Sequence, residues 1–550
     1  MNIPTLKEIR RDLPEVEETP QSNTQTITID SNYQTNSAKK DLHWFILPGN
    51  EMSISESAYT IFSEIGPTHT MFSRGGAVVE VVEIEGKGEF KLIESAQFCS
   101  RIERFNRPVG AYVKKPHSDG YNLAQKACPK ETAEKLLAST EAGELLPSVT
   151  SVSNSALIVK ENSQAKVLDS GYYPNLGGIY IVHGGRAVRE IDPKEAVLAI
   201  KSLLDDFSFQ TEGDKSRAIA SFLTPALRFG GHISGSVPVD VAEATESQSG
   251  KTYRHKIIAA LYRETLDVVT QIKGVGGGDE PFFNSLCRGR PFIQFDNWRG
   301  KLDSPTLEAF VTTNGQFGTR GAYRKWGAVD SRKFYLMLTS NGFEATRDFC
   351  NRSNIIRIKK QVQGYQYKPY DEGDLVEHIR VHQSYYQGCV FSVIRDWIVR
   401  GEQKTAETRH DFREWCQVCD WIVQELFGCA PLMDGHQKAK DRVSNPNMTW
   451  LRKIAVAAAN NNLLNKQLNA SDIVELGDQE GIELPGQVTV SNENTAKRKV
   501  GGIMRKLFDT KSILTCEDYV VSREEIFAPR ADRPHENTLM KVYVFGEGTP

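Results

Sequence analysis

The stretch Thr245-Glu246-Ser247-Gln248-Ser249-Gly250-Lys251-Thr252 decides the fold of this chain. A β-branched run at residues 237–243 precedes it, and a segment with helical spacing follows at residues 253–262. A Gly-Lys-Thr between a strand and a helix is typical of a phosphate-binding loop, because backbone N–H groups of the loop and of the helix N-terminus surround phosphate oxygens. The stretch therefore predicts a P-loop in an α/β core, with strands and helices alternating to about residue 360.

Two side chains of this loop have specific roles in the P-loop interpretation. Lys251 is expected to reach the β- and γ-phosphates of ATP, and the Thr252 hydroxyl is expected to bind Mg²⁺. The loop begins with Thr245 where the usual motif begins with Gly, so its local backbone geometry should differ. The alternative is a chance Gly-Lys-Thr in an ordinary turn, and the motifs further along the chain favour the P-loop.

A second motif lies at residues 291–297, where Pro-Phe-Ile-Gln-Phe forms a mostly apolar strand before Asp296 and Asn297. Asp296 follows Lys251 by 45 residues. Ligands of α/β sheets bind at the carboxyl ends of the strands, so Asp296 is expected beside the phosphates, where it would hold Mg²⁺ through water. The alternative is a strand-end Asp that begins a turn.

Further polar residues follow a third apolar strand at residues 333–339. Asn341 comes at the end of this strand, where a polar side chain can orient the hydrolytic water or touch the γ-phosphate. Arg347 and Arg352 follow in a Thr-Arg-Asp-Phe-Cys-Asn-Arg-Ser stretch. The competing interpretations are a turn residue for Asn341 and surface ion pairs for the arginines.

In this order, the segments Gly-Lys-Thr, Phe-Asp-Asn, Thr-Ser-Asn and Arg-Asp-x-x-x-Arg-Ser resemble the helicase-like ATPases of phages, plasmids and integrated mobile elements, which are related to superfamily-three and minichromosome-maintenance-like AAA+ helicases. The order of the motifs is similar over roughly residues 120–430, and the stretch from Cys128 to Tyr173 looks like the region before the ATPase in primase–helicase proteins. The resemblance implies an AAA+ ATPase that uses ATP and Mg²⁺ as a homo-oligomeric, hexameric ring. It also implies a DNA helicase that serves replication of a mobile element.

The resemblance implies roles for three of the residues above. Asn341 takes the position called sensor 1. Arg352 would reach into the neighbouring subunit's site and neutralise charge that develops on the γ-phosphate, with Arg347 as the second choice.

The residue after Asp296 departs from the family pattern. Many AAA+ proteins have Glu there to polarise the attacking water, but this chain has Asn297. An amide orients water by hydrogen bonds and does not accept its proton, so either hydrolysis is slow or another carboxylate helps. Glu243 and Glu308 are the candidates.

A hairpin that contacts single-stranded DNA in the ring's pore is expected at residues 317–326, because the family places such a hairpin just before sensor 1. The segment has a Gly-bounded turn, aromatic residues that can stack on bases, and the cations Arg320, Arg324 and Lys325, which can contact phosphates. The alternative is a solvated hairpin with a core Trp.

A second nucleic-acid contact is expected near the C-terminus. Residues 496–508 combine an apolar helical stripe with the cations Lys497, Arg498, Arg505 and Lys506, and a strand pair follows. The arrangement resembles a winged helix-turn-helix, which would bind duplex DNA. The alternative is an amphipathic helix used for packing, and Gly501 and Gly502 weaken the helix by about 1 kcal/mol each relative to Ala.

The expected fold is an α/β P-loop AAA+ core with an N-terminal α+β domain, helical segments and a C-terminal winged-helix-like domain. The expected divisions are a disordered polar tail (1–40), the N-terminal domain (41–190), the ATPase core with leading helices (191–370), a helical region (371–445) and the winged-helix-like domain (446–550). No apolar run is long enough to span a membrane and no signal-peptide core is visible, so a cytoplasmic location is expected.

Three functions remain open from the sequence. The first is the helicase-type motor, the second is an ATPase that remodels nucleoprotein without unwinding, and the third is an ATP-bound DNA-binding regulator with little turnover. The net charge of −3 gives no global attraction to nucleic acid, so any DNA contact must come from local basic patches.

Overall fold

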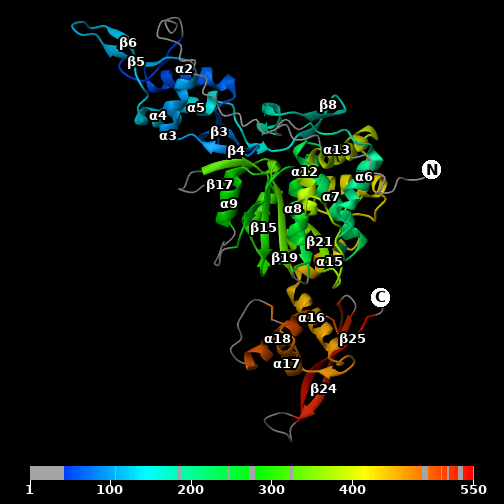
Figure 1. Ribbon diagram of the computed structural model, residues 1–550. Coiled ribbons are helices and arrows are strands. Elements are labelled where there is room, and N and C mark those ends of the chain that lie inside the picture. The colour runs from blue at the N-terminus through cyan, green and yellow to red at the C-terminus, as the bar shows by residue number, and fades with distance from the viewer. Residues whose placement is uncertain are drawn as a thin grey trace. The chain divides into compact units, whose positions relative to one another are not determined.

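A computed structural model describes residues 43–105, 107–182, 187–244, 248–271, 279–320, 326–482, 484–485, 493–509, 511–516, 519–529 and 537–548. Its contacts divide the chain into two compact units (Figure 1). The first comprises Met1–Ile61 and Glu94–Ser139, and the second comprises Phe62–Ile93 and Thr140–Pro550.

The first unit has a small sheet in the order β1-β5-β6, with β1 parallel and β6 antiparallel to β5. Its buried side chains include Phe45, Phe98 and Leu136. Its elements are β1 (Phe45–Ile46), most of α2 (Ile54–Ile65), α3 (Ser95–Arg101), β5 (Val109–Lys114), β6 (Tyr121–Gln125) and α4 (Lys130–Leu137).

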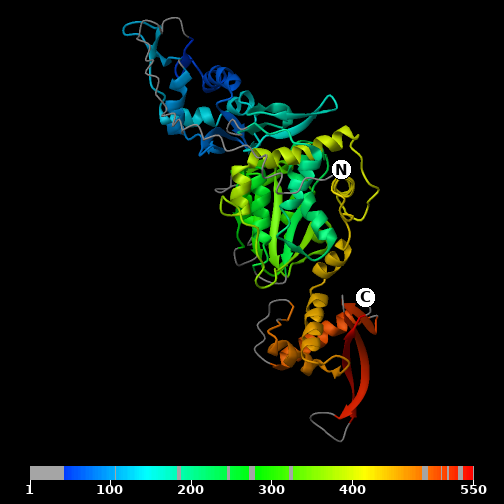
Figure 2. The same cartoon turned by 45° about the vertical axis from the view of Figure 1, so that its right-hand side comes forward.

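The second unit is organised around a six-stranded sheet in the order β12-β21-β13-β19-β15-β14, whose strands lie side by side in Figures 1 and 2. Five strands are parallel, and β12 pairs antiparallel with β21. Every residue of β13 is buried, as expected for a strand covered on both faces. The strands are β12 (Ser208–Phe209), β13 (Val239–Ala244), β14 (Asp267–Val269), β15 (Phe292–Trp298), β19 (Tyr335–Asn341) and β21 (Ser353–Lys359).

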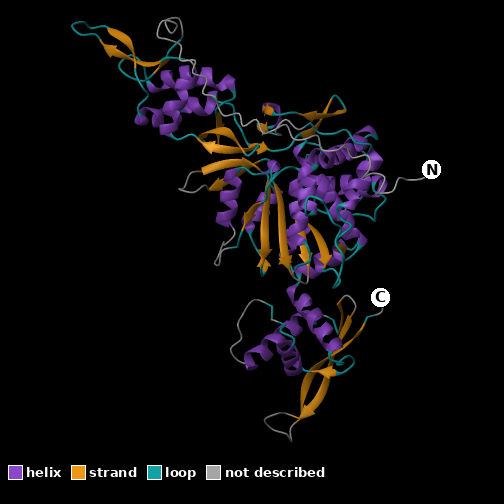
Figure 3. Cartoon of the chain, viewed as in Figure 1, coloured by secondary structure: helices purple, strands orange, loops and turns teal. Residues whose placement is uncertain are grey.

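Helices cover both faces of this sheet, which Figure 3 shows in purple beside the orange strands. One face packs on a core formed with α6 (Pro193–Ser202), α7 (Glu212–Phe229), α8 (Lys251–Leu261), α12 (Leu375–Val381), α13 (Gln383–Val399) and α14 (Arg413–Trp421). The other packs on α9 (Asp279–Arg288), α10 (Pro305–Thr312), α11 (Arg347–Asn351) and α15 (His436–Ser444). The alternation of strands and helices expected from the sequence is therefore a mixed α/β fold with helices on both sides of the sheet.

Smaller sheets of the second unit flank this core. An antiparallel hairpin, β17 (Gln316–Arg320) and β18 (Trp326–Asp330), occupies the segment where a hairpin was expected, and its turn lies outside the described residues. The remaining elements are β2 (Phe72–Arg74), β3 (Ala77–Ile84), β4 (Lys87–Leu92), α5 (Thr140–Leu145), β7 (Ser151–Ser153), β8 (Leu157–Glu161), β9 (Gln164–Leu168), β10 (Gly171–Tyr173), β11 (Ile179–Ile181), β16 (Lys301–Leu302) and β20 (Glu344–Ala345).

The C-terminal segment has its own hydrophobic core, formed by three helices and a sheet in the order β22-β25-β24-β23. Val500 and Met504 of the expected apolar stripe are buried in this core, and Ile503 and Leu507 pack against it. The elements are α16 (Pro446–Asn460), β22 (Gln467–Leu468), α17 (Ala470–Gln479), α18 (Glu493–Leu507), β23 (Ile513–Cys516), β24 (Tyr519–Pro529) and β25 (Asn537–Glu547).

In the part of the chain that the structure describes, no helix combines the length and apolar character needed to cross a bilayer. The domain boundaries proposed from the sequence stay predictions.

Candidate functional site

The candidate site lies at the carboxyl ends of three adjacent parallel strands of the central sheet. Ala244, the last residue of β13, pairs with Asn341, the last residue of β19, and β15 is the next strand along. Gly250 has φ of +89° and precedes the first turn of α8, which begins at Lys251. A positive φ of this size favours glycine, which explains Gly250 at this position. The N-terminus of α8 therefore begins a few residues after the carboxyl end of β13.

Lys251 is buried at this edge of the sheet. Its Nζ donates to Oδ1 of Asn341 at 2.7 Å and to Oγ of Ser249 at 3.1 Å. Burial lowers the pKa of Lys251, while the carboxylates of Asp296 and Glu243 oppose that shift. A buried ammonium beside hydroxyl and amide oxygens can bind an anion through charge-assisted hydrogen bonds, which is the chemistry expected of a phosphate-binding lysine.

Thr252 and Asp296 face each other across the site. The Thr252 hydroxyl donates to Oδ1 of Asp296 at 3.0 Å. The same oxygen accepts from the Thr339 hydroxyl at 2.9 Å and from Nε2 of Gln294 at 3.0 Å. Three donors thus orient the Asp296 carboxylate toward the loop.

Asn297 lies in an irregular part of β15. The register with β19 shifts between Phe295 and Trp298, and the strand continues through Trp298, beyond Asp296, where the sequence suggested its end. Asn297 has φ of +49°, a conformation that Asn tolerates better than most residues, and its N–H donates to Oγ1 of Thr339 at 2.7 Å. The bulge exposes Asn297 beside Asp296.

The two carboxylates considered as helpers for hydrolysis already have partners in the chain. Glu243 is buried and forms a two-pronged ion pair with Arg442 of α15. Glu308 accepts a hydrogen bond from the Thr346 hydroxyl and lies 3.9 Å from the Arg352 guanidinium. A role as base would require either carboxylate to leave its partner, which for Glu243 would break a buried ion pair.

The two candidate arginine fingers differ in their surroundings. Arg347 is the first residue of α11 and is exposed, whereas Arg352 follows the end of that helix and is about one quarter exposed. The contact between Arg352 and Glu308 lies within one chain, so a role in a neighbouring subunit's site would replace it.

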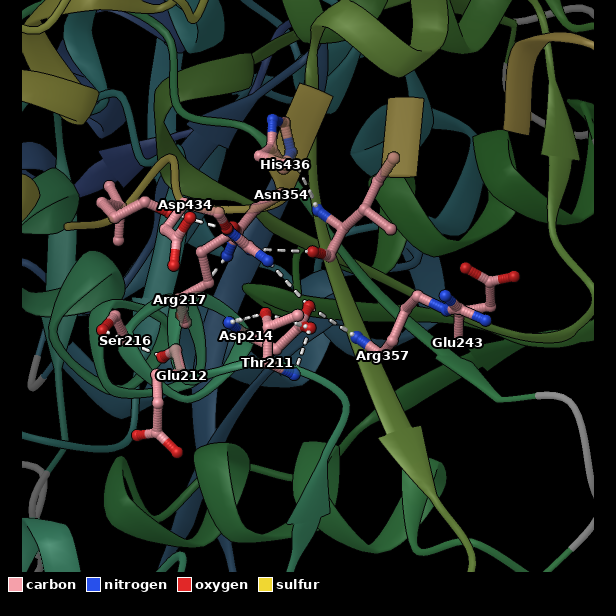
Figure 4. A network of polar contacts seen from close by, with 12 residues as sticks. Thr211, Glu212, Asp214, Ser216, Arg217, Glu243, Asn354, Arg357, Asp434 and His436 are labelled. Carbon is pink, nitrogen blue, oxygen red and sulfur yellow. Dashed lines mark hydrogen bonds and ion pairs between the residues drawn. The ribbon is translucent and has the colours of Figure 1, made fainter. Parts of the chain in front are cut away.

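A buried polar network ties α7 to β21 and to the segment before α15 (Figure 4). Arg217 donates to Oδ1 of Asp214 at 2.7 Å, to the carbonyl of Ile355 at 2.9 Å and to the carbonyl of Asp434 at 2.8 Å. Asp214 also accepts from the N–H of Arg357 at 3.0 Å. The network holds the start of α15, the helix that carries Arg442, against the sheet.

The candidate nucleic-acid residues lie in two separate places. Arg320 is the last residue of β17, and Arg324 and Lys325 lie outside the described residues. On α18, Arg498, Arg505 and Lys506 are exposed and Lys497 is half-buried. Of the loop, Thr245, Glu246 and Ser247 also lie outside the described residues, and Gln248 adopts φ of +61°.

Sequence reasoning missed several residues that shape the site. Gln294 and Thr339 both hold Asp296, and a polar residue inside an otherwise apolar strand was the available signal for each. Arg442 lies 199 residues from Glu243, and nothing local in the sequence indicates that pairing.

The donor set suits the metal that the P-loop interpretation implies. Mg²⁺ prefers oxygen ligands, and the site brings the Thr252 hydroxyl to the Asp296 carboxylate. The residues present therefore fit Mg²⁺, which Thr252 and Asp296 would bind.

No family model matches the chain, and no curated protein matches it. Among solved structures, the chain is similar to the C-terminal region of NrS-1 in its A-form apo structure, with 8% identity over 88% of this chain and 99% of that one and a TM-score of 0.34. It is also similar to the active helicase SCCmec type IV Cch, with 11% identity over 86% of this chain and 92% of that one and a TM-score of 0.31. Scores of this size carry no argument about function, which rests on the residues of this chain.

Proposed function

We propose that this chain is an ATP-hydrolysing P-loop enzyme of the AAA+ type that works as a nucleic-acid motor, most simply a DNA helicase for replication of a mobile element. One observation carries the proposal. The Thr252 hydroxyl lies 3.0 Å from Asp296 while Lys251 lies 2.7 Å from Asn341, all at the carboxyl ends of neighbouring parallel strands. Four residues, predicted from three separate sequence motifs, lie together here, which supports the proposal.

Each residue has a role that follows from its chemistry. The buried ammonium of Lys251 neutralises phosphate charge, and the N–H groups at the start of α8 add donors directed at the same anion. Mg²⁺, when bound to Thr252 and Asp296, supplies charge neutralisation on the phosphate oxygens. Asn341 and Asn297 offer amides that orient the attacking water.

The proposed motor is a homo-oligomeric ring. In such a ring Arg352 would leave Glu308 and stabilise charge on the γ-phosphate bound to the next subunit, and Arg347 is the alternative. DNA would contact the β17–β18 hairpin through Arg320, Arg324 and Lys325. The helix α18, with Lys497, Arg498, Arg505 and Lys506, would add a duplex contact in a winged-helix-like module.

The proposal is tested by ATP turnover of the purified chain. Lys251→Ala is expected to abolish turnover, because it removes the ammonium proposed to neutralise the phosphates. Lys256→Ala is a matched control, because Lys256 is exposed on the same helix. Unchanged turnover in Lys251→Ala would contradict the proposed site.

A second function, an ATP-bound DNA-binding regulator with little turnover, is favoured by Asn297, which replaces a general base with an amide. ATP turnover measured with and without single-stranded DNA separates the two functions. A motor is expected to accelerate on DNA and to displace a strand from a forked substrate, while a regulator binds ATP and DNA without either response. Oligomer size in the same samples tests the ring.

A further inference from the structure

A cluster of metal-ligand residues lies after β21, outside the candidate nucleotide site. Glu372 precedes α12, His378 lies within that helix and His382 follows its last residue. Nδ1 of His378 lies 2.8 Å from one oxygen of Glu372, and Nε2 of His382 lies 2.9 Å from the other. Among the described residues, this is the one group of three such side chains whose ligand atoms all lie within 4.8 Å of one another.

The spacing of the two histidines explains why they meet. Residues four apart share one face of a helix, and the rings of His378 and His382 are 4.6 Å apart between centroids. Zn²⁺ binds imidazole nitrogen and carboxylate oxygen at about 2.0–2.2 Å, which in a tetrahedral site separates ligand atoms by roughly 3.4 Å. The two contacts between the histidines and Glu372, at 2.8 and 2.9 Å, would each widen by about half an ångström, which side-chain rotation can supply.

The surroundings resemble those of a metal-binding histidine. The other ring nitrogen of His378, Nε2, lies 3.0 Å from the Tyr386 hydroxyl of α13. Metal-binding histidines almost always donate this second N–H to an oxygen, which orients the ring. The three side chains of the cluster are each about one fifth exposed (18%, 21% and 23%), so an ion and a water ligand can reach them.

We propose that Glu372, His378 and His382 form a binding site for a divalent transition-metal ion such as Zn²⁺, with two imidazole nitrogens, one carboxylate oxygen and water as ligands. Two imidazoles with a carboxylate suit Zn²⁺ better than Mg²⁺, which prefers oxygen ligands alone. The site is distinct from the Mg²⁺ site proposed at Thr252 and Asp296.

Bound metal would fasten the segment before α12 to the α12–α13 junction. The start of α12 lies beside α8, the helix that follows the candidate nucleotide loop. The N–H of Val376 donates to the hydroxyl of Tyr253, the residue after Thr252, at 3.3 Å. The ion would therefore stiffen a helix that packs directly on α8. This consequence does not depend on the proposed ATPase activity.

The experiment is a titration of the metal-stripped, full-length chain with ZnCl₂ in the absence of nucleotide, followed by calorimetry. A parallel titration with Co²⁺ reports coordination geometry through its ligand-field absorption. The variants are Glu372→Gln and His382→Gln, which remove one ligand each and keep side-chain size. Tyr386→Phe removes only the hydroxyl beside His378.

The wild-type chain is expected to bind one Zn²⁺ at this site with a rise in thermal midpoint. Glu372→Gln and His382→Gln should each weaken binding more than tenfold, and Tyr386→Phe should weaken it by about tenfold as the loss of an orienting partner. Two controls should retain wild-type binding: His117→Asn, which changes an exposed histidine elsewhere, and Asp296→Asn, which removes the candidate Mg²⁺ ligand. Circular dichroism checks that each variant folds.

Absence of stoichiometric Zn²⁺ binding by the wild-type chain would overturn the proposal. So would binding that survives both ligand substitutions, or binding lost in Asp296→Asn but not in Glu372→Gln. Failure of the ATPase proposal would leave the zinc titration unaffected, so the two outcomes are distinguishable.

Discussion

The two faces of the central sheet each bury a carboxylate of the same strand, β13, and pair it in different ways. On one face, Asp240 binds Arg254 and His255 of α8, the helix that immediately follows the candidate nucleotide loop. On the other, Glu243 binds Arg442 of α15. The first pair joins segments 14 residues apart, and the second joins segments 199 residues apart.

The difference teaches what each pair does. The Asp240 pair fastens α8 to the strand that precedes the loop, so it sets the geometry of a local strand–loop–helix unit. The Glu243 pair lies one residue before the end of β13 and brings a distant helix to the edge of the candidate site. The first pair stabilises the loop's scaffold, and the second couples the site to the part of the chain beyond residue 430.

The largest expected effect comes from breaking the local pair. Asp240→Ala leaves the fully buried Arg254 without its carboxylate and should lower the free energy of unfolding by about 3–5 kcal/mol. Urea unfolding followed by circular dichroism measures the change. The double variant Asp240→Leu/Arg254→Met should recover much of the loss, since it leaves no buried charge; an equally unstable double variant would contradict the ion-pair explanation.

The next prediction compares two buried carboxylates, Asp240 with a guanidinium partner and Glu264 with neutral hydrogen-bond partners. Burial would raise the pKa of Asp240, but Arg254 and His255 more than offset it and hold the pKa well below its usual range. Glu264 has neutral partners instead, the N–H and Nδ2 of Asn154 at 2.7 and 2.9 Å, and burial raises its pKa to about 7.

A raised pKa means that the folded chain holds the Glu264 proton more tightly than the unfolded chain. Its stabilising contribution is therefore fully present below the ordinary glutamate pKa of 4.5 and is lost as the pH rises through the folded pKa of about 7. The free energy of unfolding should fall by about 3 kcal/mol over this pH range. The fall in thermal midpoint between the two pH values checks this. Glu264→Gln should remove this part of the pH dependence, and a variant with the wild-type pH profile would assign it to another group.

A smaller loss is expected from the distant pair. Glu243→Gln keeps the size of the side chain but leaves Arg442 with a neutral partner, and Arg442 retains some contact with solvent. The free energy of unfolding should fall by about 2 kcal/mol, less than for Asp240→Ala. If Glu243 is only an ion-pair partner, ATP turnover per folded molecule should fall modestly. A loss of turnover as complete as in Lys251→Ala would instead support Glu243 as the helper carboxylate.

The smallest expected effect comes from a hydrogen bond to Asp240 on the first face of the sheet. The Tyr335 hydroxyl donates to Oδ2 of Asp240 at 3.2 Å, so Tyr335→Phe removes one hydrogen bond from a carboxylate that keeps its ion pair. Unfolding should become easier by about 1 kcal/mol. Tyr335→Phe in the Asp240→Leu/Arg254→Met background is the control and should cost nothing further; an equal loss there would mean that the hydroxyl acts through another contact.

Local patterns in the sequence determined the parts of this protein that depend on neighbouring residues. The Gly-Lys-Thr between a strand and a helix, the apolar strands before Asp296 and Asn341, and the hairpin around Arg320 are all visible as spacing and composition, because backbone geometry and burial are set over a few residues. The apolar stripe with Val500 and Met504 likewise indicated which face of α18 packs inward.

Only the tertiary structure decided which segments meet. The order of the strands in the sheet places Asn341 beside Lys251 and Asp296 beside Thr252. The pattern of apolar and polar residues along the chain does not predict that order. Arg442 reaches Glu243 because the packing of helices on the sheet brings together two residues 199 positions apart, and neither carries a local mark of its partner. Contacts within an element follow from local conformation, whereas contacts between elements depend on how the whole core minimises its exposed apolar surface.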